Sequence, residues 1–184
     1  MESNNIKLLF ISLFALCTTN KCCTKCPVDQ VEVFASRDLD SRLNTREVAA
    51  VSEFEESGRG VHALRDHPYH TDGVPMVGGC WGARLAGRRH LWEAAWRQIL
   101  ADPLTYAERG TKGPDQKLLT RHVWPWARLD SLQHGSYKCA QYPGTIGFPS
   151  RRERVADNYM ASAGDTLWVE CPMQCRRYPN WTHC

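Results

Sequence analysis

Long apolar runs, dense charge of one sign and internal repeats are all missing from this sequence. The longest apolar stretch, Leu8 to Cys17 with one serine inside it, is about half of the roughly 20 residues that a membrane-spanning helix needs. The formal net charge is only +3. The densest basic runs, Arg88-Arg89 and residues 151–154, come without a zinc-finger or RNP-like pattern. These absences exclude a nucleic-acid-binding module and leave only the N-terminal stretch for contact with a membrane.

That N-terminal stretch has the length and apolar core of a signal peptide. We predict a signal peptide or short anchor over residues 1–20, with cleavage between Thr18 and Asn20 as the first expectation. An uncleaved anchor is the alternative, and it is the only route by which the chain would stay attached to a membrane. A buried helix of the fold remains the third interpretation.

Cysteine, by contrast, is abundant, with nine residues in the chain. Disulfides persist in oxidising compartments, so we expect the secretory pathway: the ER or Golgi lumen, or the extracellular space. Residues 21–30 form a cysteine-rich linker, and removal of Cys17 with the leader would leave an even number, enough for four bridges. Zinc binding by Cys171, Cys175, His183 and Cys184 is the competing interpretation. Asn180-Trp181-Thr182 is a glycosylation sequon.

Residues 31–184 alternate between strand-like and helix-like segments, which predicts an α/β domain with a mixed sheet and flanking helices. Apolar β-rich patterns predict strands over residues 31–35, 61–64 and 74–77. Capping and apolar spacing predict a helix between Asn44 and Gly58, a second over residues 89–100, and a third from Pro114 that ends at residues 124–126. From Cys139 onward we expect loops tethered by disulfides.

Asp38-Leu39-Asp40 follows the first predicted strand and is the first candidate site. Two carboxylates at alternate positions project to the same side of an extended backbone. Hard divalent cations such as Mn²⁺ and Mg²⁺ prefer such oxygen ligands. Ser41 and Arg42 add groups suited to phosphate. Surface or helix-capping acids are the plain alternative for this short motif.

Four further positions carry polar or flexible residues beside predicted elements. His134 in Gln133-His134-Gly135 has a side chain that serves Mn²⁺-class ions, although most single histidines are structural. Asp66 stands in a polar cluster after a strand, as either an active-site residue or a hydrogen-bonded corner. Gly78-Gly79 favours close approach of backbone to a ligand or strand. Asp115-Gln116 opens a helix, where an N-terminal cap is the simpler role.

In this order, the strand with Asp38-Leu39-Asp40, Gly78-Gly79, Asp115-Gln116 and the late His134 resemble GT-A-fold nucleotide-sugar glycosyltransferases, in particular the glycogenin-like and galactosyltransferase-like group. The resemblance covers their C-terminal part only. It implies a partial, N-terminally truncated GT-A-like domain with a disulfide-tethered C-terminal tail, because few residues precede Asp38.

The resemblance also implies a role for each residue. Mn²⁺ or Mg²⁺ would bind Asp38, Asp40 and His134, and the donor would be a nucleotide sugar, with a UDP-sugar as the first candidate and a glycan or protein as acceptor. The donor would contact Arg37, Ser41, Arg42, Gly78 and Gly79, and Asp66, Asp115 and Gln116 would serve as catalytic residues. The alternative function is that of a secreted, cysteine-rich protein that binds glycans or proteins without catalysis.

Overall fold

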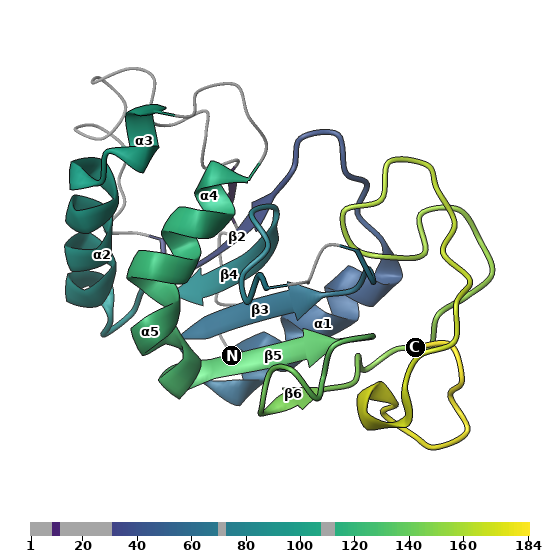
Figure 1. Ribbon diagram of the computed structural model, residues 1–184. Helices are drawn as coiled ribbons and strands as arrows, with labels where there is room; N and C mark the ends of the chain where they lie inside the picture. Colours follow the sequence, from purple (N-terminus) through teal and green to yellow (C-terminus); the bar gives the residue numbers. More distant parts are fainter. Residues whose placement is uncertain (1–8, 12–30, 70–72, 108–112) are drawn as a thin grey trace.

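A single mixed β-sheet organises the chain in the computed structural model (Figure 1), which describes residues 9–11, 31–69, 73–107 and 113–184. Its strand order is β1-β2-β4-β3-β5-β6. The strands are β1 (Leu9–Ile11), β2 (Val33–Arg37), β3 (Val61–Arg65), β4 (Cys80–Arg84), β5 (Ser131–Gly135) and β6 (Thr145–Ile146). Only β4 runs antiparallel to its neighbours β2 and β3, while β3, β5 and β6 are mutually parallel. The predicted α/β class with a mixed sheet and flanking helices is confirmed.

Helices cover both faces of this sheet (Figure 1). The helical elements are α1 (Thr45–Ser57), α2 (Arg89–Ala101), α3 (Leu104–Ala107), α4 (Pro114–Leu118), the π-helix η2 (Leu119–Val123), α5 (Trp124–Ala127), and the 3-10 turns η3 (Arg128–Asp130) and η4 (Met173–Cys175). Val61 and Trp81 face a core that includes Ala95 and Ile99 of α2. Leu64 and Cys80 face Ala50 of α1 on the other side. Alternate side chains of β3 and β4 therefore enter two separate cores.

Helix α1 begins and ends where its sequence predicts. The Asn44 side chain accepts a hydrogen bond of 2.8 Å from the backbone N–H of Glu47, which satisfies one free donor at the helix start. Gly58 follows the last turn with φ of 66°, a left-handed conformation that costs glycine little. The predicted strands at 31–35 and 61–64 are also present, the first shifted to 33–37.

The strand predicted at 74–77 is wrong, while the end of the helix from Pro114 was predicted to within one residue. Residues 74–77 form an irregular, bent segment instead of a strand, and β4 starts only after the turn at Gly78-Gly79. Pro75 has no N–H to donate to a sheet, and its carbonyl instead accepts a hydrogen bond from Arg65. The helix from Pro114 ends close to the predicted residues 124–126: it passes through a π-helical turn into α5, whose last residue is Ala127. Pro125 falls in the first turn of α5, where a missing N–H is tolerated.

Two disulfides tether the C-terminal region, as predicted. Cys139, just after β5, pairs with Cys175, and Cys171 pairs with Cys184. The pairing rules out the zinc interpretation for these cysteines, while Cys80 is a buried free thiol. The predicted leader and the linker cysteines lie outside the described residues, apart from β1. Within the described ranges, no helix is long and apolar enough to span a membrane.

Candidate functional site at the carboxyl edge of the sheet

Most of the predicted site residues gather at one edge of the sheet. Because β2 and β3 run in the same direction, their C-terminal ends meet at this edge, and Asp38 and Asp66 follow those ends directly. The antiparallel strand β4 starts there, so Gly78-Gly79 lies at the same edge. Ligands of open α/β sheets bind outside the carboxyl ends of parallel strands.

Two carboxylates lie against the glycine pair. A methyl group on Gly78 would collide with the carboxylate of Asp115, and one on Gly79 would collide with the carboxylate of Asp38. Only glycine leaves room for both acids at this point. The hydroxyl of Ser36 donates a 2.9 Å hydrogen bond to the Gly78 carbonyl, which fixes the turn on β2. The structure thus joins three motifs that are far apart in the sequence.

The electrostatics of this acid pair are unfavourable without a cation. Partial burial raises the pKa of the Asp115 carboxyl, and the charge of Asp38 raises it further, although the backbone N–H of Gln116 opposes the shift. Burial also raises the pKa of the Cys80 thiol, with Asp38 as the next contributor. Asp40 is exposed to solvent. Among the described residues, no three His, Cys, Asp or Glu side chains are grouped so as to hold a metal ion.

The residues predicted to contact phosphate are tied to the protein. Arg37 forms an ion pair with Glu47 at 2.6 Å between Nε and Oε1. The Ser41 hydroxyl donates to the Asp38 carbonyl at 2.9 Å, which tightens the turn that carries the acid. Arg42 contacts Asp157 at 3.2 Å, yet 68% of its side chain remains exposed. Of the three, Arg42 is the side chain most accessible to a ligand.

Asp66 lies at the same edge but is completely enclosed. Arg46 binds both of its oxygens, at 2.8 and 3.0 Å, and Arg152 and the Ser136 hydroxyl both donate to Oδ1. The backbone N–H of Met160 donates to Oδ2 at 3.1 Å. Burial opposes ionisation, but the two guanidinium groups and these hydrogen bonds lower the pKa of Asp66. With both oxygens bound, Asp66 has the contacts of a structural ion pair.

His134 lies in β5, one residue before the strand ends, and is paired with Leu64 of β3. Its side chain is fully buried, with Nδ1 at 2.8 Å from Nε2 of His62 and Nε2 at 3.1 Å from Oε2 of Glu53. Glu53 in turn binds Arg177 at 2.9 Å. Burial lowers the pKa of His134 to about 4, in spite of Glu53. Both ring nitrogens therefore have protein partners, and the structure does not bring His134 to the acid pair.

Several residues of this edge were not singled out from the sequence. Arg46, Ser136 and Arg152 enclose Asp66, and His62 pairs with His134. Arg46 is a charged residue on the buried face of α1, and His62 stands inside a strand whose every residue is buried. Such buried polar residues need partners, but their burial is known only from the structure. Gln116 is half-buried beside Asp115 in α4.

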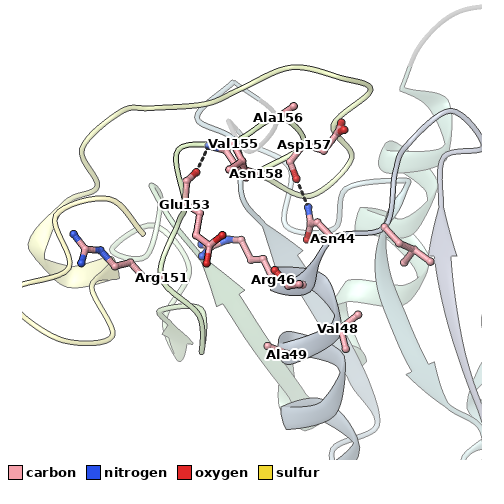
Figure 2. Close-up of a pocket in the computed structure, with 12 residues that line it drawn as sticks. Asn44, Arg46, Val48, Ala49, Arg151, Glu153, Val155, Ala156, Asp157 and Asn158 are labelled. Carbon is pink, nitrogen blue, oxygen red and sulfur yellow. Dashed lines mark hydrogen bonds between the residues drawn. The ribbon is translucent and has the colours of Figure 1, made fainter.

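A groove with a volume of about 750 Å³ opens elsewhere, between the start of α1 and residues 151–158 (Figure 2). None of the predicted site residues lines it. Its walls carry the exposed apolar side chains of Leu43, Val48 and Val155, with Arg151 and Glu153 beside them. The Asn44 amide, which donates to the Asp157 carbonyl at 2.9 Å, joins the two sides.

No family model, curated protein or solved structure matches this chain.

Proposed function

We propose that the carboxyl edge binds a divalent cation, Mn²⁺ or Mg²⁺, together with the diphosphate of a nucleotide sugar, and that the protein transfers the sugar to a glycan or protein acceptor. A UDP-sugar is the first donor to test. The observation that carries the proposal is the contact of Asp38 and Asp115 with the adjoining Gly78 and Gly79. The proposal includes the GT-A-like arrangement that the sequence motifs suggest.

The donor atoms suit such a cation. Mg²⁺-class ions are commonly held by one or two carboxylates, with substrate phosphates and water as the remaining ligands. Asp38 and Asp115 supply two carboxylates. Burial, and to a smaller extent the charge of Asp38, raises the pKa of Asp115, and a positive charge between the two acids would offset both effects. When bound, the cation neutralises the charge that develops on the leaving diphosphate.

The surrounding residues would bind and orient the donor. Arg42 can leave Asp157 for a phosphate oxygen, because an exposed ion pair is worth little. Asp40 is exposed within the same turn and can accept hydrogen bonds from water or a sugar hydroxyl. In this arrangement Asp66 and His134 do not contact the donor. Their side-chain oxygens and nitrogens already have protein partners among the described residues, so both residues support the structure of the edge.

Calorimetry with Mn²⁺, alone and with a UDP-sugar, tests the proposal. We expect binding by the native chain and a loss of at least tenfold in affinity for Asp38→Asn and Asp115→Asn, since each removes a ligand charge. Glu93→Gln is the matched control, because Glu93 is an exposed acid on α2. Absence of Mn²⁺ binding, or equal binding by all three variants, would refute a cation site at this edge.

The groove of Figure 2 favours a second candidate, a non-catalytic binding protein of the secretory pathway. Its apolar walls and charged rim resemble a recognition surface more than a metal centre. The two disulfides agree with an oxidising environment. Glycan-array binding that persists in chelator and is lost in Val48→Glu would support it, whereas signal abolished by chelator would favour the carboxyl edge.

A further inference from the structure

The sequon Asn180-Trp181-Thr182 lies in the segment that the Cys171–Cys184 disulfide closes into a loop. Trp181 donates its backbone N–H to the Tyr178 carbonyl at 2.9 Å. This bond makes a β-turn with Pro179 and Asn180 at its centre, and proline is favoured at that first central position. Asn180 is therefore presented at the tip of a turn, and its side chain is exposed.

The amide of Asn180 differs from those of the other asparagines in the described body. The Asn44 amide donates to two carbonyls and accepts from Glu47. The Asn158 amide donates to the Glu153 and Leu167 carbonyls and accepts from Leu167. Asn180 makes no side-chain hydrogen bond within the described ranges. The only one of the three that stands in a sequon is thus the only one whose amide is free.

We infer that Asn180 is an N-glycosylation site. The Asn180 Nδ2 atom forms a bond to the anomeric carbon of a lipid-diphosphate-linked oligosaccharide. The anomeric C–O bond to the diphosphate breaks, the diphosphate leaves with its electron pair, and a base of the transferase takes one amide proton. The folded protein accommodates the glycan, because Asn180 points to solvent on a turn whose backbone bond does not involve its side chain.

The fold also sets the time of this modification. A transferase that reads the sequon must contact the Thr182 hydroxyl as well as the amide. In the folded chain the Thr182 hydroxyl lies 3.1 Å from Nδ1 of His183, and the Thr182 carbonyl accepts a 2.9 Å hydrogen bond from Cys171. The disulfide between Cys171 and Cys184 holds both contacts in place. Glycan addition therefore precedes closure of that disulfide.

The experiment expresses the full chain in eukaryotic cells and compares its gel mobility before and after peptide N-glycosidase F. We expect one glycan on the native chain, none on Asn180→Gln or Thr182→Ala, and a retained glycan on Thr182→Ser, which keeps the hydroxyl. Asn44→Gln is the matched control, since Asn44 stands outside any sequon. Mass spectrometry of the released peptide should find aspartate at position 180.

A native chain that shows no glycosidase-sensitive shift overturns the inference, as does a shift that survives in Asn180→Gln. The order of events has its own test in the Cys171→Ser/Cys184→Ser double variant. We expect its glycan occupancy to equal or exceed that of the native chain, and a lower occupancy would refute modification before disulfide closure. These outcomes do not depend on cation or donor binding at the carboxyl edge.

Discussion

Asp66 and Asp38 follow β3 and β2, two strands that run in the same direction on either side of β4, and the two acids differ in almost everything else. Asp66 is buried between Arg46 and Arg152, and both of its oxygens are bound. Asp38 is exposed, and its carboxylate lies against Gly79, next to the Asp115 carboxylate against Gly78. The fold supplies the counter-charge of the first acid, while the second stays exposed beside another carboxylate. Position at a sheet edge thus does not decide whether an acid is structural or available to a ligand; the arginines around it do.

Among the substitutions that test this difference, removal of the Asp66 charge should have the largest effect on the free energy of unfolding. Asp66→Asn leaves Arg46 and Arg152 buried without their counter-charge, and loss of one partner of a buried pair costs about 3–5 kcal/mol. Asp38→Asn should change the free energy of unfolding by less than about 0.5 kcal/mol, as exposed substitutions do. Urea denaturation at neutral pH measures both. Similar losses in the two variants would show that the acids are not distinct.

Removing a disulfide from the C-terminal region should make Asp66 less enclosed, as Asp38 is, because its partner Arg152 belongs to that region. Cys139→Ser/Cys175→Ser should lower the free energy of unfolding by about 2–4 kcal/mol. The Cys171→Ser/Cys184→Ser pair is the matched comparison. Its sequence separation is 13 residues instead of 36, so the loss should be about 1 kcal/mol smaller. Urea denaturation of both variants measures the two losses of unfolding free energy. A larger loss on removal of the disulfide with the shorter loop would contradict the chain-entropy account.

The buried pair His62 and His134 should make stability depend on pH in a window separate from that of Asp66. Burial lowers the pKa of His134 from 6.5 to about 4, so the unfolded chain binds more protons between these values. Stability is then lost as the pH falls from about 6.5 to about 4, by roughly 3 kcal/mol from His134 alone, and the lowered pKa of His62, which is also caused by burial, adds to this loss. Asp66, whose pKa is lowered from 3.8, adds its loss only below about pH 4.

Unfolding curves at several pH values separate the two contributions. His134→Gln should make the free energy of unfolding depend less on pH above pH 4, even if the variant is less stable at every pH. His90→Gln, on the exposed surface of α2, should leave the slope as it is. A slope that His134→Gln does not change would assign the proton uptake to other groups.

The smallest expected effect comes from Asp115. Its pKa is raised in the fold, so the ionised carboxylate destabilises the folded state at neutral pH, and this cost disappears as the pH falls through the folded and then the unfolded pKa. Asp115→Asn should raise the free energy of unfolding at pH 7 by less than about 1 kcal/mol while weakening Mn²⁺ binding. Thermal unfolding with and without Mn²⁺ tests both, and a loss of stability would show that the ionised Asp115 carboxylate does not destabilise the fold.

The sequence predicted the elements whose signals are local. The Asn44 cap, the Gly58 stop and the apolar alternation of β2 and β3 act within a few residues, and all are present. Strand β5, Ser-Leu-Gln-His-Gly, is short and polar, and its inclusion depends on pairing with β3, so no local pattern identified it. Strand β4 was likewise not predicted, because it also depends on pairing with distant strands, β2 and β3.

The candidate site was predictable in its members and not in their grouping. Asp38, Gly78, Gly79 and Asp115 were each singled out, and the structure places them together. His134 and Asp66 were singled out by the same reasoning. In the structure, however, His62 contacts His134 and Arg46 pairs with Asp66, and both partners come from distant parts of the sequence. Tertiary contacts over such separations leave no pattern in the sequence. An acid or histidine in a motif therefore shows its role only when its partners are known.

The reversed direction of β4 has a consequence for how the carboxyl edge can move. Gly79 directly precedes Cys80, and Cys80 is paired with Arg37 in the ladder between β4 and β2. The Cys80 amide also donates to the Val77 carbonyl at 3.0 Å. A shift of the glycine pair would have to break bonds of a central strand, which open only with a large fraction of the global unfolding energy. Amide exchange at Cys80 should therefore be among the slowest in the chain. The glycine pair should accordingly keep the same backbone conformation with and without a ligand.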